Sequence, residues 1–229
     1  MMETSVALIT VGFALGLVHA LDADHVMAVS VMNSERPGLL RNLGYCANWA
    51  LGHGGVLLLS GLLLFGFGVG VPETVAAYAE VLVGIFLVLM GLICLWRFRR
   101  ERLVLQEHRH GDMVHRHWQV EGSDHAGEID GDRLRRHAPV MVGVMHGLAG
   151  SAPALALIPA VVHGELVTAM LYLILFSLGV MLAMLAFGLG FGATQQYLQQ
   201  RYLWLFQAFR NLVATASILL GGFWISQAI

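Results

Sequence analysis

Four ionisable side chains lie within seven residues near the start of the chain: His19, Asp22, Asp24 and His25. Imidazole and carboxylate groups form a borderline ligand set that suits nickel, cobalt, zinc or iron(II) better than copper(I). On a helix turning 100° per residue, His19, Asp22 and His25 occupy an arc of about 120°, and Asp24 points away unless the helix unwinds. The spacing predicts a transition-metal site. The alternative is that the carboxylates are solvated at a membrane boundary and the histidines only pack.

Two further histidines lie in apolar surroundings. His53 is flanked by glycines and lies about ten residues, or ~15 Å of helix, inside the uncharged stretch 43–71. His146 precedes a glycine-rich segment that ends at Pro153, where a helix breaks easily. A single buried histidine is usually a satisfied core residue. Because the first group needs partners, we expect these two to complete the metal site or to line the path of an ion.

The composition requires a membrane around these groups. Of 229 residues, 57% are hydrophobic and 12% are charged, about half the charged fraction of an average globular protein. The stretches 43–71 and 166–200 contain no Asp, Glu, Lys or Arg, and each exceeds the ~20 apolar residues that cross a bilayer. A net charge of −2 with no lysine excludes a nucleic-acid-binding surface. The chain is therefore expected to be a multi-pass membrane protein.

The hydrophobic pattern predicts an all-α fold with six transmembrane helices. The first is expected to be kinked or partly unwound at its two aspartates. Arginine placement indicates the orientation, because cytoplasmic loops are enriched in Arg and Lys. One side of the six spans carries nearly all the arginines, so we expect that side to face the cytoplasm, with both termini periplasmic or extracellular and the protein in the cell inner membrane. The six expected spans are 4–32, 43–70, 75–96, 138–162, 167–193 and 203–227.

The chain divides into a first three-helix half, 1–96, a polar loop, 97–137, and a second three-helix half, 138–229. Weak self-similarity at an offset of 127 residues relates the halves, pairing Gly16, His19 and Leu21 with Gly143, His146 and Leu148, and Leu51-Gly52 with Leu178-Gly179. Because each half has an odd number of spans, such repeats would be inverted, a common plan of secondary transporters. The alternative is that so few identities in apolar sequence arise by chance.

The loop 97–137 is rich in charged residues and glycine and is expected to be flexible and cytoplasmic. It contains six of the eleven histidines, including His108-x-His110 and His115-x-His117. These pairs either bind a transition metal weakly or belong to a solvated loop whose arginines fix the orientation.

Taken together, these motifs resemble a known family. His19-Ala-Leu-Asp-Ala-Asp-His25 is similar to the signature of the nickel/cobalt transporter family (NiCoT), and Leu51-Gly52-His53 resembles its second histidine motif. The segment from Val144 to Ala152 is more similar to the shorter urease-accessory-type nickel permeases. The resemblance implies that the first motif lies in a membrane helix and recognises the metal. Typical members have more spans than the six expected here, and an efflux branch carries a long His-rich loop, so the resemblance indicates the substrate rather than its direction.

The favoured function is a secondary transporter for Ni²⁺ or Co²⁺ that is not an enzyme and holds no resident cofactor. A potential of 100 mV contributes ~2.3 kcal/mol per charge, which favours uptake of a divalent cation over export. The expected partners are the metal ion, the bilayer and an unidentified cytoplasmic metal acceptor. The alternatives are metal efflux through the same site, or an intramembrane zinc-dependent hydrolase with Asp22 as base. The absence of a His-Glu-x-x-His pair argues against the hydrolase.

Overall fold

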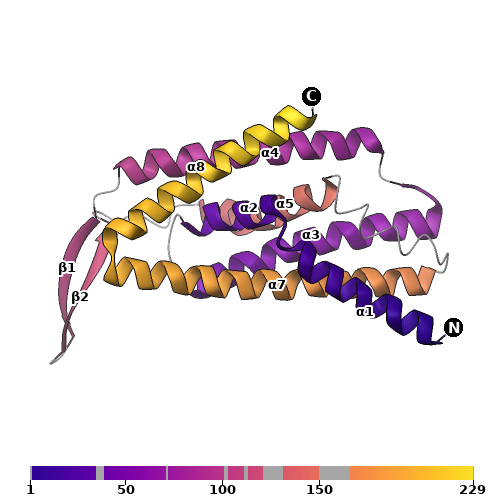
Figure 1. The fold of residues 1–229 in the computed structure, drawn as a ribbon, viewed down its shortest axis with the longest axis horizontal. Helices are drawn as coiled ribbons and strands as arrows, with labels where there is room; N and C mark the ends of the chain where they lie inside the picture. The colour runs from indigo at the N-terminus through magenta and orange to yellow at the C-terminus, as the bar shows by residue number, and fades with distance from the viewer. Residues whose placement is uncertain are drawn as a thin grey trace.

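The computed structural model describes residues 2–34, 39–70, 72–100, 103–110, 113–120, 131–149 and 166–228. Long helices dominate these residues and extend along a common direction (Figure 1). A two-stranded hairpin projects from one end of the helices. The elements are α1 (Met2–His19), α2 (Ala23–Ser34), α3 (Leu39–Phe67), α4 (Glu73–Arg100), β1 (Leu103–His110), β2 (Met113–Val120), α5 (Gly131–Leu148), α7 (Leu166–Arg201) and α8 (Leu203–Ala228).

The chain is a multi-pass membrane protein. Within the described residues, α3, α4, α7 and α8 are each long and apolar enough to cross a bilayer, and α1 with α2 forms a fifth candidate span that is bent by 56°. The predicted fourth span, 138–162, coincides with the second half of α5 and then enters residues outside the described part of the chain. The expected total of six spans is therefore not reached within the described residues, which hold four or five candidates.

The first predicted span is interrupted where its aspartates begin. The amides of Leu21 and Asp22 bond to carbonyls only three residues back, those of Val18 and His19, so the helix tightens and ends. The new helix starts at Ala23, and the Asp22 carbonyl accepts from Val26. Neither proline nor glycine occupies the break. Aspartate just before the first helical residue favours a new helix start, so the expectation of a kinked first span is confirmed.

Glycines bring the backbones of several helices into contact. A Cβ atom at Gly16 of α1 would overlap the carbonyl of Phe176 on α7, and one at Gly179 of α7 would overlap that of Phe13 on α1. The crossing of α3 with α5 is built in the same way. There Gly52 meets the carbonyl of Val140, and Gly143 meets that of Trp49. Small residues that allow backbones to approach are typical of helix packing in membranes.

Substituting alanine at Gly52 should destabilise the protein. The added methyl group would overlap the carbonyl of Val140, and overpacking of this kind typically costs about 1–3 kcal/mol. Alanine at Gly55, on the same helix, would meet nothing within 4 Å. We expect Gly52→Ala to melt about 2–4 °C lower per kcal/mol lost, and Gly55→Ala to melt no lower than the wild type. Thermal unfolding in detergent measures both, and equal melting temperatures would contradict this packing.

The loop predicted over 97–137 contains more structure than expected. Helix α4 continues to Arg100, α5 already begins at Gly131, and β1 pairs with β2 in antiparallel register, with His108 opposite His115. The expectation of a flexible stretch was therefore wrong over 103–110 and 113–120. The missed signal is a run of residues with high strand propensity on either side of Gly111-Asp112, a dipeptide typical of tight hairpins.

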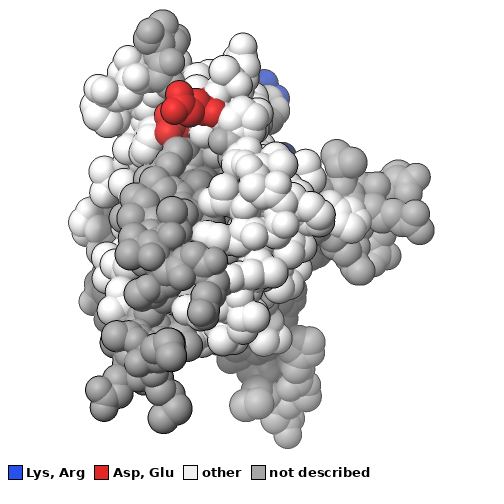
Figure 2. All heavy atoms as spheres, turned by 90° about the vertical axis from the view of Figure 1, so that its right-hand side faces the viewer, with Lys and Arg blue, Asp and Glu red and all other residues white. Residues whose placement is uncertain are grey.

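The two ends of the helical bundle differ in charge. The end where α4 and α7 finish carries Arg97, Arg99, Arg100 and Arg201. The opposite end, where α4 begins, carries Glu73. Figure 2 views that second end, where the coloured surface is mainly an acidic patch. Within the described residues, the arginines are thus grouped as the sequence predicted.

Candidate metal site

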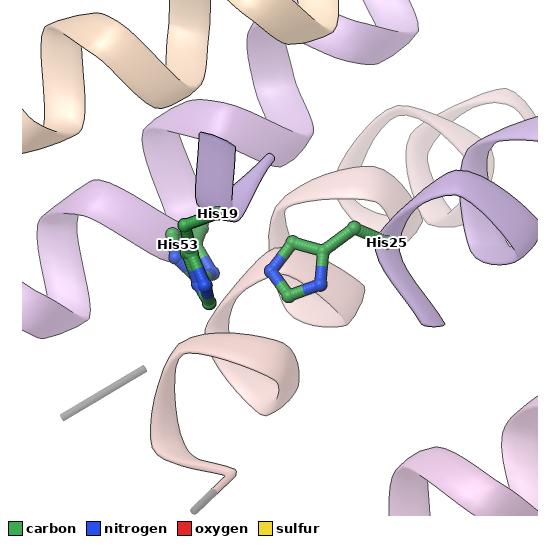
Figure 3. A group of neighbouring side chains, drawn as sticks. All are labelled: His19, His25 and His53. Atoms are coloured by element: carbon green, nitrogen blue, oxygen red, sulfur yellow. The ribbon is translucent and has the colours of Figure 1, made fainter. Parts of the chain in front are cut away.

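Three imidazole rings from three helices meet inside the bundle. His19 is the last residue of α1, His25 lies in the first turn of α2, and His53 lies midway along α3. One ring nitrogen from each lies within 4.8 Å of the others, and all three residues are buried. In Figure 3 the rings of His19 and His53 lie beside each other and the ring of His25 faces them. The ring centroids are 4.7 Å apart for His19 and His25, and 5.1 Å for His25 and His53.

A fourth histidine adjoins this group from α5. The ring of His146 is fully buried, and its centroid lies 5.5 Å from that of His25. His146 does not belong to the tight group of three, whose nitrogens are closer together. It therefore borders the group at the side formed by α2.

The outward nitrogens of these rings have partners that orient them. His25 Nδ1 lies 2.8 Å from a carboxylate oxygen of Asp24, and His146 Nδ1 donates to the carbonyl of Val142 at 2.8 Å. His19 Nδ1 lies 2.8 Å from a carboxylate oxygen of Asp22, close enough for an ion pair but not aligned for a hydrogen bond. Histidines that ligate metals typically donate their second ring N–H to a carboxylate or backbone carbonyl. A proton on Nδ1 leaves the Nε2 lone pair available.

The inward nitrogens have no partner among the described residues. The Nε2 atoms of His19, His25 and His146, and both ring nitrogens of His53, are buried without a hydrogen bond. Leaving a buried polar group unpaired costs about 1–3 kcal/mol. Several such atoms around one point are costly in an empty protein, whereas a metal ion would accept their lone pairs. The donor set thus fits a borderline divalent cation.

The two aspartates lie at the edge of the group and differ in exposure. The Asp24 side chain is only 10% exposed and bonds to His25, whereas that of Asp22 is 41% exposed. Asp22, Asp24 and His25 themselves form a second cluster with metal-ligand spacing. Because His25 belongs to both clusters, the carboxylates adjoin the three imidazoles. The break between α1 and α2 therefore brings Asp24 to the same site as His19, which a continuous helix would not do.

Aromatic side chains that the sequence analysis missed enclose the histidines. Trp49 stacks on His53 with centroids 5.0 Å apart and planes 13° apart, and its edge contact with His25 is also 5.0 Å. Phe176 on α7 lies 5.4 Å from the ring of His19. Trp49 precedes His53 by four residues, one helical turn on the same face, and that spacing was the available signal. These rings exclude water and limit rotation of the imidazoles.

With this geometry in hand, the chain can be compared with known proteins. The family model for the cytochrome c biogenesis protein transmembrane region matches residues 11–223. The chain belongs to this family. The urease accessory protein UreH of Bacillus sp. (strain TB-90) is 29% identical over 181 residues, which cover 79% of this chain and 74% of that protein. No solved structure matches.

The comparisons bear on the earlier resemblance in two ways. The relative is named as a urease accessory protein, the class of shorter proteins to which the motif around His146 is similar. The matching family model is not one of nickel/cobalt transporters, so the more specific NiCoT resemblance still depends on the motifs alone. Every residue of the histidine cluster lies inside the matched range 11–223.

Proposed function

We propose that this protein is a secondary transporter that moves a divalent transition-metal ion, Ni²⁺ or Co²⁺, through the membrane. The observation that carries the proposal is the set of buried, unpartnered imidazole nitrogens of His19, His25 and His53, which converge from three helices of a membrane protein. Nickel and cobalt accept such ligands, and the similarity to a urease accessory protein supports nickel.

In this proposal the imidazoles replace water around the ion while the carboxylates of Asp22 and Asp24 compensate its charge. Nearby opposite charge is needed because a cation inside the bilayer is costly. Asp24 also fixes the His25 ring, so that its Nε2 lone pair is directed inward. His146 stands next to His25 and would take part when the ion arrives or leaves. Because the ligands come from separate helices, a shift between helices can dismantle the site and release the ion.

We further propose that the two halves are inverted repeats. With the offset of 127, the contact of Gly16 with Phe176 is equivalent to that of Gly143 with Trp49. The contact of Gly52 with Val140 is equivalent in the same way to that of Gly179 with Phe13. The ring contact of His19 with Phe176 likewise corresponds to that of His146 with Trp49, 5.7 Å apart. These exchanged pairs support an approximate twofold axis through the site, and rocking of one half on the other would open it to alternate sides.

The proposed direction is uptake. The arginine-rich end is assigned to the cytoplasm of a cell whose inner membrane holds the protein. A divalent cation that enters down a potential of 100 mV gains ~2.3 kcal/mol for each of its charges. Efflux through the same site and a zinc-dependent hydrolase remain the alternatives, and transport assays separate them.

Cells that express the protein should accumulate radioactive nickel faster than cells with an empty vector. Collapse of the membrane potential with a protonophore should abolish the difference. Lower nickel content in the expressing cells would reverse the direction to efflux. Zinc that stays bound to the purified protein and does not exchange with added nickel would support the hydrolase instead.

A further inference from the structure

A second group of buried polar side chains lies where α2, α3 and α7 meet. Five residues of these helices are buried within a largely apolar bundle and carry amide or hydroxyl groups. They contain no charge, and the metal site described above does not include them. They are Ser30, Asn33 and Ser34 on α2, Asn42 on α3 and Gln195 on α7.

These side chains surround a common space. The Gln195 amide donates to the Ser34 hydroxyl at 3.3 Å, which joins α7 to α2. A Cβ atom at Gly192, one turn before Gln195, would lie 2.7 Å from the side-chain nitrogen of Asn42, so α7 also meets α3 at this level. Helices α2, α3 and α7 thus present their polar groups to one another.

The group is not a satisfied hydrogen-bond network. Both polar atoms of the Asn42 side chain, the amide nitrogen of Asn33 and the amide oxygen of Gln195 are buried without a partner among the described residues. Buried amides that serve only to join helices are normally paired, because each unpaired group costs stability. The unmet donors and acceptors therefore indicate an occupant with its own hydrogen-bonding or coordinating atoms.

The group's position connects it with the histidine cluster. Asn33 follows His25 by eight residues on α2, a rise of about 12 Å, and Asn42 precedes His53 by eleven residues on α3, a rise of about 16 Å. The end of α2 and the start of α3 lie towards the arginine-rich end of the bundle. The polar group thus stands between the metal site and that end.

We propose that this polar group is a second, uncharged station on the ion path, which holds the divalent cation with part of its water shell after it leaves the histidines. The inference rests on the proposed transport function. Amide and hydroxyl oxygens coordinate a cation or its water weakly, so the ion is released rather than trapped. The amide N–H groups can bond to the remaining water oxygens or to a counter-ion.

The test compares two asparagines of α3. Asn42 is buried in the polar group, whereas Asn48 is exposed on the surface of the same helix. We expect Asn42→Leu to lower the initial rate of nickel uptake at least about tenfold, while nickel still binds the histidine cluster in equilibrium dialysis of the purified protein. Asn48→Leu should match the wild type in both assays. Wild-type uptake by Asn42→Leu would overturn the second station and leave the proposed function standing.

A charged variant keeps the test decisive if Asn42→Leu fails to insert. A carboxylate in Asn42→Asp should hold the ion instead of passing it on, so one more nickel ion per chain should be retained and uptake should slow. Unchanged stoichiometry in Asn42→Asp would overturn the proposal and leave the group a structural one. Loss of nickel binding in the wild type itself would instead refute the proposed function.

Discussion

His53→Ala should abolish nickel accumulation while leaving the protein folded. His53 supplies two buried, unpartnered nitrogens at the centre of the cluster and stacks on Trp49. Loss of a residue that only orients a ligand typically lowers metal affinity about 10–100-fold, so loss of a ligand should cost at least about 100-fold. Because an unsatisfied polar ring is removed, the melting temperature should fall little. Initial nickel uptake and equilibrium dialysis measure the two effects.

The matched control is His137→Ala. His137 is exposed on α5 and lies far along that helix from His146, so its removal tests whether a general loss of histidine matters. Uptake by His137→Ala should equal that of the wild type. If His53→Ala transports nickel at the wild-type rate, the cluster is not the transport site and the proposed function is refuted.

The second large effect is expected from Asp24→Asn, which preserves shape and removes one negative charge. Asp24 is buried and orients the His25 ring, so the substitution weakens charge compensation and releases the ring. Breaking a buried charged pair by changing one partner typically costs about 3–5 kcal/mol, and a comparable penalty on the bound ion would lower nickel affinity more than about 100-fold. Dialysis at several nickel concentrations measures the shift.

Asp22→Asn provides the comparison because Asp22 contacts His19 in the same way but is much more exposed. Water screens its charge, so its loss should weaken binding less than the loss of Asp24. An equal effect of the two substitutions would show that burial does not determine their contributions.

Much of the site was predictable because its residues are chemically out of place. Ionisable groups in apolar sequence are expensive, so His19, Asp24 and His25 could be recognised from their positions alone. The broken first span followed from the same aspartates. That His53 lies beside His19 and His25 could only be expected, since no sequence rule fixes which helices are neighbours.

The features that sequence reasoning missed depend on tertiary packing or on weak local signals. Trp49 and Phe176 are ordinary apolar residues in apolar helices, and only the fold shows that they enclose the histidines. The hairpin over 103–120 was hidden by its many charged residues, which suggested a loop. The second half of the predicted fourth span, 149–162, lies almost entirely outside the described residues.

The glycine contacts have a consequence for the order in which this chain can fold. Helix α1 packs on α7, and α3 packs on both α5 and α7, so each half supplies neighbours to the other. When α1 is synthesised, the surface that receives Gly16 does not yet exist, because α7 is made more than half a chain later. Contacts between such distant segments form late. The first helices must therefore wait in the bilayer with their polar side chains uncovered, and neither half can complete its packing when expressed alone.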